Sequence, residues 1–315
     1  MNVLLTNTGR RTYFIDFCLD LKKEYKKLNV HVCDNNIYSP TLNFKNIKKH
    51  VTPKVREGEE KYISAIISIV KRNKINLIIP FTNYDIIILS KKKRFFKNLN
   101  CDVAVSDYRI SEIFLDKNKT FAFCKKHNIP TPEIINKGLV KKYNKKKKVV
   151  EKNIKGNASE DLRILEKNSK FKLKKKFIYQ KYIKGSELHF DILNDFEGNY
   201  ISSCIKRKIS MRSGETDIAQ TLNQNVFYKL AKNISRKTGH IGNLDCDAII
   251  DKNRKVFFLD FNPRFGGGYP FTHMSGLNYL KFLIYSLKKK KFNIKKIPRR
   301  IISAKGISVH KNYEK

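Results

Sequence analysis

The chain has 315 residues, of which 41% are apolar and 11% aromatic. A chain of this length and content can bury the cores of two or three lobes, which excludes an intrinsically disordered protein. No apolar run approaches the roughly 18 to 20 residues that span a bilayer, and the first residues read as a strand instead of a signal peptide. The six cysteines form no C-x-x-C pattern, which predicts reduced, buried thiols without a zinc site or disulfides. We therefore expect a cytoplasmic protein with no membrane partner.

The formal net charge of +39 would ordinarily suggest a nucleic-acid or membrane partner. However, 53 of the 67 cationic residues are lysines, and they are spread along the whole chain together with many Asn, Ile, Phe and Tyr residues. This composition is typical of proteins encoded by AT-rich genomes. We interpret the charge as compositional and keep nucleic-acid binding as the weaker alternative. The densest run of lysines, residues 142–148, is expected to form a solvated turn.

Strands and helices alternate over the first third of the chain. We expect strands at residues 3–6, 30–33, 77–79 and 103–105, and helices that begin near residues 14, 62 and 85. This alternation predicts an α/β domain with a parallel, doubly wound sheet, whose ligands lie at the carboxyl ends of the strands. The turn at Gly9, Arg10 and Arg11 fits a simple turn and an anion site equally well. Because no G-x-G-x-x-G motif is present, we expect no dinucleotide cofactor.

The regular alternation of strands and helices ends after a helix at residues 116–127, which stops at Asn128-Ile129-Pro130-Thr131-Pro132. Strands are expected at residues 149–152, 177–183, 188–193, 200–209, 244–250 and 256–261, with one helix at 226–238. The last two strands read as an antiparallel pair joined by residues 251–254. The sequence therefore predicts a second, α+β domain with mostly antiparallel sheets, and a domain boundary near residue 112.

The most informative segment is residues 256–268, a strand-like apolar run that ends in alternating polar residues and three glycines. Asp260, Asn262 and Arg264 are two residues apart, so in a strand they point to the same face. Asp and Asn supply oxygen ligands suited to Mg²⁺, and Arg supplies a fixed positive fork for phosphate. The pattern predicts a magnesium-bound polyphosphate site. A plain polar turn at the end of a strand is an alternative of similar weight.

Nucleotide-binding candidates lie earlier in the second block. Lys152 precedes the small-residue loop Gly156-Asn157-Ala158-Ser159, whose backbone N–H groups could close over phosphates. An extended connector, Gln180-Lys181-Tyr182-Ile183, could read an adenine edge through its backbone, and Glu187 could accept hydrogen bonds from a ribose. A lone lysine in so basic a chain is also readily explained as a surface residue.

Three further charged residues could complete the site. Asp247 lies on the strand before Asp260 and could join the metal ligands across the hairpin. Arg207 and Arg212 could hold a phosphate or a substrate carboxylate, or they could be ordinary charges on a sheet.

Taken in order, these segments resemble the ATP-grasp superfamily, especially its single-unit branch similar to the large subunit of carbamoyl-phosphate synthase. The resemblance covers nearly the whole chain and rests on residues 2–20, 77–90, 116–132, 151–159 and 259–268. It implies a Rossmann-like pre-ATP-grasp domain at residues 1–111 and an ATP-grasp domain at residues 112–315. The latter would comprise a small nucleotide-covering subdomain at about 120–185 and a larger metal-binding subdomain at about 186–290.

The chain departs from the family pattern at several positions. Asp260 replaces the usual Glu, Asn128 replaces the usual Gly, and Lys181 stands at a hinge position often taken by Glu. Asn153 and Ile154 stand where Pro and Arg are common.

The resemblance also implies roles for single residues. Those on the nucleotide would be Lys117 and Lys152 at the phosphates, Gly156 to Ser159 above them, Gln180 to Ile183 at the adenine, and Glu187 at the ribose. Asp247, Asp260 and Asn262 would bind Mg²⁺, with Mn²⁺ as an alternative metal. Arg264 and Arg207 would contact the transferred phosphoryl group.

The activity implied is an ATP-dependent carboxylate–amine ligase. A substrate carboxylate would be activated as an acyl phosphate and joined to an amine or similar nucleophile, with release of ADP and phosphate. The expected partners are these two small molecules and a second copy of the chain in a homodimer. The main alternative is a catalytically idle relative that binds ATP as a sensor or partner module, and the lesser one is the nucleic-acid-binding protein.

Overall fold

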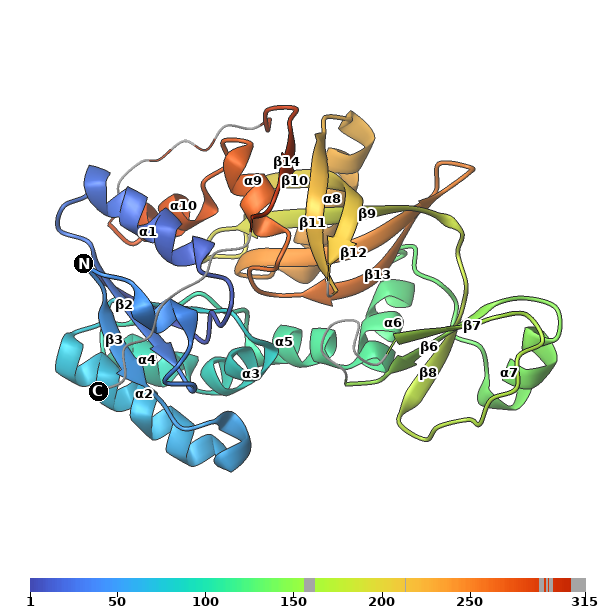
Figure 1. Cartoon of the computed structure of the whole chain (residues 1–315), viewed down its shortest axis with the longest axis horizontal. Helices are drawn as coiled ribbons and strands as arrows, with labels where there is room; N and C mark the ends of the chain where they lie inside the picture. The colour runs from blue at the N-terminus through green and yellow to red at the C-terminus, as the bar shows by residue number, and fades with distance from the viewer. Residues whose placement is uncertain (156–161, 213, 289–291, 293, 295–296, 307–315) are drawn as a thin grey trace.

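The structure is a computed structural model that describes residues 1–155, 162–212, 214–288, 292, 294 and 297–306 (Figure 1). Its first part is a five-stranded parallel sheet of order β3-β2-β1-β4-β5, which confirms the predicted α/β class. The strands are β1 (Asn2–Thr6), β2 (Asn29–Asp34), β3 (Lys48–Val51), β4 (Leu77–Pro80) and β5 (Asp102–Val103). The helical segments are α1 (Tyr13–Glu24), η1 (Pro40–Asn43), η2 (Val55–Glu57), α2 (Glu59–Asn73), α3 (Asn83–Lys91) and α4 (Lys93–Asn98).

A buried carboxylate, that of Asp85, holds the turn between β1 and α1 in place. Asp85, in the first turn of α3, accepts hydrogen bonds from Thr6 Oγ1 at 2.9 Å, Asn7 Nδ2 at 2.8 Å and the Tyr62 hydroxyl at 2.8 Å. Burial raises the pKa of Asp85, and these donors oppose the rise. Because the donors come from β1, the following turn and α2, Asp85 fixes the path of the chain at the carboxyl end of the sheet.

Two helices lead from this sheet toward a small lobe (Figure 1). They are α5 (Tyr108–Leu115) and α6 (Lys117–Lys126). Asp116 caps α6, since its carboxylate accepts hydrogen bonds from the backbone N–H groups of Asn118 and Lys119 at 2.9 and 3.1 Å. The helix ends before Asn128, which has a left-handed φ of 54°. Asn tolerates this conformation better than most residues, which explains how it stands where the family usually has Gly.

The small lobe is an antiparallel sheet of order β7-β6-β8 beside one helix. Its elements are α7 (Lys137–Asn144), β6 (Val149–Asn153), β7 (Leu162–Leu165) and β8 (Phe177–Lys181). On β6, Glu151 points into the lobe and accepts a hydrogen bond from Tyr179 at 3.0 Å, so its neighbour Lys152 points to the opposite face. The lysine run at residues 142–148 begins within α7, so only its second half forms the predicted turn.

The third part is a six-stranded antiparallel sheet of order β13-β12-β9-β10-β11-β14. Its strands are β9 (Gly185–Asn194), β10 (Tyr200–Arg212), β11 (Glu215–Leu222), β12 (Gly242–Asp251), β13 (Val256–Asn262) and β14 (Ile302–Ala304). The helices are α8 (Asn225–Thr238), α9 (Tyr269–Met274) and α10 (Tyr279–Ser286). The predicted antiparallel pair is β12 with β13, and the predicted α+β class is confirmed.

One hydrophobic core joins the parallel sheet to the six-stranded sheet. Phe14 of α1 stacks on Tyr269 of α9 with ring centroids 5.5 Å apart, and Phe81 lies 6.0 Å from Phe265. All four rings are buried in or at the same cluster, which also contains residues of α10. Aromatic pairs of this kind add packing energy beyond the area they bury. The β1–α1 turn is thereby held against the glycines that follow β13.

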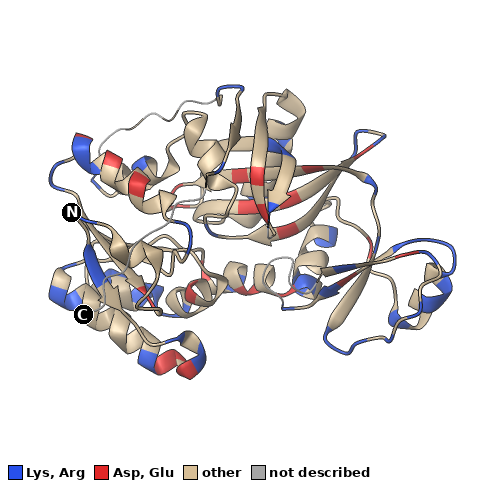
Figure 2. Ribbon diagram, viewed as in Figure 1, with Lys and Arg blue, Asp and Glu red and all other residues tan. Residues whose placement is uncertain are grey.

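The basic residues lie mainly on the outside of the molecule, whereas several acidic residues lie on strands of the six-stranded sheet (Figure 2). All six cysteines are buried and unpaired, as predicted. None of the helices in the described part of the chain is both long and apolar enough to cross a membrane. The boundary near residue 112 and the subdomain limits stay predictions.

Candidate active site

A cavity of about 480 Å³ opens where the three parts of the molecule meet. The six-stranded sheet forms one wall through side chains of β9, β10, β12 and β13. The start of α6, strand β6 and Leu162 of β7 close one end, and the β1–α1 turn closes the other. Of the residues predicted to act, the lining includes Lys117, Lys152, Glu187, Asp247, Asp260, Asn262 and Arg264.

The strand register explains why the predicted metal ligands share a wall. Asp247 pairs directly with Asp260, and Asp245 pairs with Asn262, across the β12–β13 ladder. Directly paired residues of antiparallel strands lie on the same face, and so do residues two apart. The four side chains therefore present carboxylate and amide oxygens to one part of the cavity. Such a donor set fits Mg²⁺, which prefers oxygen ligands.

A side chain from the first domain orients this wall. Asn83, at the start of α3, accepts a hydrogen bond from Arg264 Nε at 2.9 Å and donates one to Asn262 Oδ1 at 3.4 Å. Arg264 also donates from Nη1 to Asp245 Oδ2 at 3.1 Å, and burial lowers its pKa. The guanidinium predicted to contact phosphate is thus held from both sides.

Lys208 is the cation nearest the predicted metal ligands on β12. Its Nζ lies 2.7 Å from Asp247 Oδ1 and 3.4 Å from Glu187 Oε2. Burial alone would lower the pKa of Lys208, but the carboxylates of Asp247, Glu187 and Asp245 together outweigh burial and the pKa is raised. The same contact holds the pKa of Asp247 below its usual range despite burial. Both groups are therefore charged at neutral pH.

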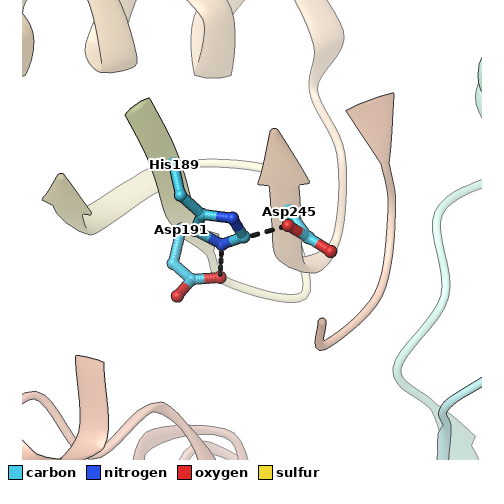
Figure 3. Close-up of side chains that lie close together, drawn as sticks. All are labelled: His189, Asp191 and Asp245. Carbon is cyan, nitrogen blue, oxygen red and sulfur yellow. Dashed lines mark ion pairs between the residues drawn. The ribbon is translucent and has the colours of Figure 1, made fainter. Parts of the chain in front are cut away.

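A group of buried charged side chains extends from this wall into the protein, and three of its members are His189, Asp191 and Asp245 (Figure 3). His189 and Asp191 come from β9 and Asp245 from β12, and their ligand atoms lie within 4.8 Å of one another. His189 Nε2 is 3.0 Å from Asp245 Oδ1 and 3.5 Å from Asp191 Oδ1. Buried Lys206 forms an ion pair with Asp191, as Arg264 does with Asp245. Each carboxylate already has a cationic partner, so we interpret the group as a charge-balanced network.

Two of the glycines after β13 make room for this network. A Cβ on Gly266 would lie 1.8 Å from Asp245 Oδ2, and one on Gly268 would lie 2.6 Å from His189 Nε2. Any side chain at these positions would displace the buried charges. Glycine is therefore needed at these two positions on steric grounds, whereas the sequence identified them only as part of a motif.

At the other side of the wall, Lys152 and Lys117 lie at the end of the cavity formed by α6 and β6. Lys152 Nζ donates to the Leu259 carbonyl at 3.3 Å, and burial lowers its pKa while Asp260 opposes the change. Lys117 is the first residue of α6, positioned by the Asp116 cap. Both lysines line the cavity with Asp260. The arrangement places two cations and one carboxylate where phosphates would be expected.

The predicted adenine connector lies beside this end. Gln180 lines a small adjacent pocket with Lys117 and Asp260, and its side chain donates to the Pro132 carbonyl at 3.1 Å. Lys181 forms an ion pair with Glu133. Tyr182 and Ile183 line neither pocket. The loop residues Gly156, Asn157, Ala158 and Ser159 lie outside the described residues.

The structure does not bring Arg207 to the cavity. It is exposed and donates to Gln220 Oε1 at 2.7 Å, while its neighbours Lys206 and Lys208 point inward. Alternate residues of a strand face opposite sides, so Arg207 cannot share their face. Arg212 likewise lies outside the lining and contacts Asp217 at 2.9 Å.

Sequence reasoning missed five residues of the site and its charged network: His189, Asp191, Lys206, Lys208 and Asp245. The signal was present as polar residues of period two within apolar strands: Glu187, His189 and Asp191 on β9, Lys206 and Lys208 on β10, Asp245 and Asp247 on β12. Such alternation marks one polar face of a sheet.

Two protein-family models match the chain. The ATP-grasp domain family matches residues 114–268, and the PylC-like N-terminal domain family matches residues 3–104. No curated protein matches the chain.

Solved structures share the fold at low sequence identity. Biotin carboxylase from Campylobacter jejuni, in a complex with β-γ-ATP, has a TM-score of 0.74 at 16% identity over 96% of this chain and 74% of that one. The biotin carboxylase domain dimer of Hydrogenobacter thermophilus 2-oxoglutarate carboxylase, with ADP, its magnesium salt and bicarbonate, gives 0.73 at 16% over 96% and 73%. N5-carboxyaminoimidazole ribonucleotide synthetase from Thermotoga maritima gives 0.66 at 15% over 94% and 77%. By these family matches the chain contains a PylC-like N-terminal domain at residues 3–104, followed by an ATP-grasp domain at residues 114–268.

Proposed function

We propose that this protein is a magnesium-dependent, ATP-consuming ligase that activates a substrate carboxylate and joins it to an amine. The observation that carries the proposal is the shared wall of the cavity. Asp247, Asp260 and Asn262 present oxygen ligands there, beside the inward cations Lys208 and Arg264. A set that combines metal ligands with cations suits a bound polyphosphate.

The chemistry would proceed in two balanced steps. The carboxylate oxygen attacks the γ-phosphorus of ATP, the bond to the bridging oxygen breaks, and ADP leaves with that electron pair. The amine then attacks the acyl carbon, loses a proton and expels phosphate, which leaves an amide. Protein groups contribute mainly positioning and electrostatic stabilisation in both steps.

The residues present fit a metal-bound nucleotide. Asp247, Asp260 and Asn262 would hold Mg²⁺, which would neutralise phosphate charge when bound. Lys117 and Lys152 would contact the phosphates from the small-lobe end, and Glu187, exposed on β9, would face the ribose. Lys208 would take the role predicted for Arg207 beside Arg264, because its side chain lines the cavity. The homodimer, the Mn²⁺ alternative and the cytoplasmic location stay predictions.

The first test measures thermal stabilisation by ATP with and without Mg²⁺. We expect a magnesium-dependent rise in Tm that is lost in Asp260→Ala, because this change removes one of the carboxylates predicted to hold the metal. Asp20→Ala, an exposed acid on α1, is the matched control and should keep the full shift. An equal shift in both variants would contradict the metal assignment.

The second test measures ADP release over a panel of carboxylates and amines. Asp260→Ala and Asn262→Ala should each lower the rate by roughly 10³-fold, since metal-based charge stabilisation contributes several kcal/mol to such transition states. Unchanged rates would contradict the site. ATP binding without ADP release across the panel would indicate the idle relative, and salt-sensitive nucleic-acid binding indifferent to ATP would indicate the basic binder.

A further inference from the structure

The part of the cavity beside the β1–α1 turn carries an excess of positive charge. Arg10 and Arg11 of the β1–α1 turn line it together with Glu215 and Thr216 of β11. Lys305, just after β14, contacts Glu215 as well. Three cations therefore lie here with one carboxylate, whereas Lys208 and Arg264, elsewhere in the lining, each contact a carboxylate of their own.

Arg11 is fixed in place by contacts on two sides. Its Nη1 donates to the Phe81 carbonyl at 3.1 Å, and Nε and Nη2 both donate to Glu215 Oε1 at 3.1 Å. A guanidinium has five N–H donors, so these bonds leave two for a ligand. The turn itself cannot shift freely, because Asp85 holds Thr6 and Asn7 directly before it.

Both carboxylate oxygens of Glu215 are engaged by cations. Lys305 Nζ lies 3.3 Å from its other oxygen, Oε2. Burial would raise the pKa of Glu215, but Arg11 and Lys305 outweigh burial and the pKa is lowered. A Cβ on Gly267 would lie 2.8 Å from Glu215 Oε2, so the backbone packs against this carboxylate too. Glu215 therefore positions Arg11 and is poorly placed to hold a substrate ammonium group.

Arg10 is exposed, lines the cavity, and forms no ion pair with any residue in the described part of the chain. Two neighbouring guanidinium groups, one fixed and one free, suit an anion with several oxygens, such as a carboxylate or phosphate. The reacting carboxylate is less suited to this place. Hydrogen bonds from two guanidinium groups would stabilise the negative charge of that carboxylate and make its oxygen a weaker nucleophile toward phosphorus.

The anchor of Arg11 and the predicted metal ligands lie on different strands. Arg11 is held by Glu215 of β11, whereas Asp260 and Asn262 lie on β13, and these two strands are not neighbours in the sheet. One group of a substrate can therefore contact Arg10 and Arg11 while another group faces the metal ligands in the same cavity.

We propose that a substrate of this protein carries a second anionic group, a carboxylate or a phosphate, that Arg10 and Arg11 bind apart from the carboxylate that is activated. This inference rests on the proposed ligase function. It narrows the substrate class to dianionic molecules with the two groups held apart.

The test compares small acids of matched length by thermal shift, with the protein saturated with Mg²⁺ and a non-hydrolysable ATP analogue. The probes are valerate, glutarate and 4-phosphonobutyrate. Glutarate or 4-phosphonobutyrate should half-saturate at a concentration roughly tenfold below that of valerate, as expected for one charge-assisted bond. The stronger of the two identifies the anion as carboxylate or phosphate. Equal half-saturation by all three acids would overturn the proposal.

Arg10→Gln should raise the half-saturating concentration of the preferred dianion roughly tenfold and leave valerate unchanged. Arg72→Gln, an exposed arginine on α2 away from the cavity, is the control for the change in net charge and should have no effect. Equal effects of the two variants would also overturn the proposal. Because Arg10 is exposed, folding of its variant is not at risk, and Arg11→Gln serves as a second variant.

The outcome is distinguishable from a failure of the proposed function. The analogue's own magnesium-dependent shift is measured in every variant, and loss of that shift in the wild type would contradict the ligase. The three acids are also titrated without nucleotide, so the preference for a dianion is decided in either case.

Discussion

The cavity wall of the six-stranded sheet and the surface of the small lobe carry charge in opposite ways. On the wall and directly behind it, Lys208, Arg264 and Lys206 are largely buried and each contacts a carboxylate. On the small lobe, the lysines of α7 and the turn after it are exposed and form no ion pair with described residues: Lys141, Lys142, Lys145, Lys146 and Lys147. The lobe adds much to the net charge (Figure 2), yet the wall holds the chemistry.

The difference teaches that net charge does not locate the site in this protein. Exposed charges are solvated and screened by salt, so their number can drift with composition at little energetic cost. A buried charge loses its hydration and must be matched by a partner. The position of matched pairs is therefore the more informative signal.

The largest expected effect comes from breaking one buried pair. Lys206→Met should destabilise the fold by about 3 to 5 kcal/mol, because it leaves the Asp191 carboxylate buried without its cation. Lys206 also donates to Thr272 Oγ1 at 2.7 Å and to the Gly268 carbonyl at 3.1 Å. The free energy of unfolding in urea measures the loss. Lys146→Met on the small lobe is the matched control and should change it by about 0.5 kcal/mol or less; similar losses in both would refute the comparison.

The second expected effect concerns His240, which is buried but forms no ion pair with any described residue, unlike the paired charges of the wall. His240 is enclosed between Thr238 Oγ1 at 2.8 Å and the Ile192 carbonyl at 2.9 Å, and burial lowers its pKa to about 4. The unfolded chain, with a pKa near 6.5, binds the proton more readily between these values. Stability should therefore fall as the pH drops from 6.5 toward 4, by up to about 3 kcal/mol from this residue.

Unfolding free energies of the wild type and His240→Asn at pH 7, 6, 5 and 4 check this prediction. The wild type should lose stability more steeply, so that the gap between the two proteins narrows with falling pH. Parallel curves would mean that His240 does not titrate in this range.

A smaller loss of stability is expected when an added methyl group crowds the buried charged network around His189. Gly268→Ala would place a Cβ 2.6 Å from His189 Nε2, and overpacking of this kind costs about 1 to 3 kcal/mol. Gly306→Ala, where a Cβ would meet no atom within 4 Å, is the control and should be neutral. Urea unfolding of both variants measures the difference, and a neutral Gly268→Ala would show that the network can move aside.

Much of the fold followed from local pattern. The parallel sheet, the β12–β13 pair and the shared face of Asp260, Asn262 and Arg264 were predictable, because alternation of strands with helices and the period of two within a strand are local properties. The edge strands β3, β7 and β14 were not, since most of their residues are exposed and burial imposes no clear apolar period on them.

The sequence by itself determined which residue types were available for a metal-phosphate site and their order along the chain. Only the tertiary structure decided that Lys208 faces the cavity while Arg207 faces solvent, and that Arg11 meets Glu215 across 204 positions of sequence. The physical reason is that a shift of one residue turns a strand side chain to the other face. Which face is inward depends on pairing with distant strands and on the domain packed against them, and neither is written in the local pattern.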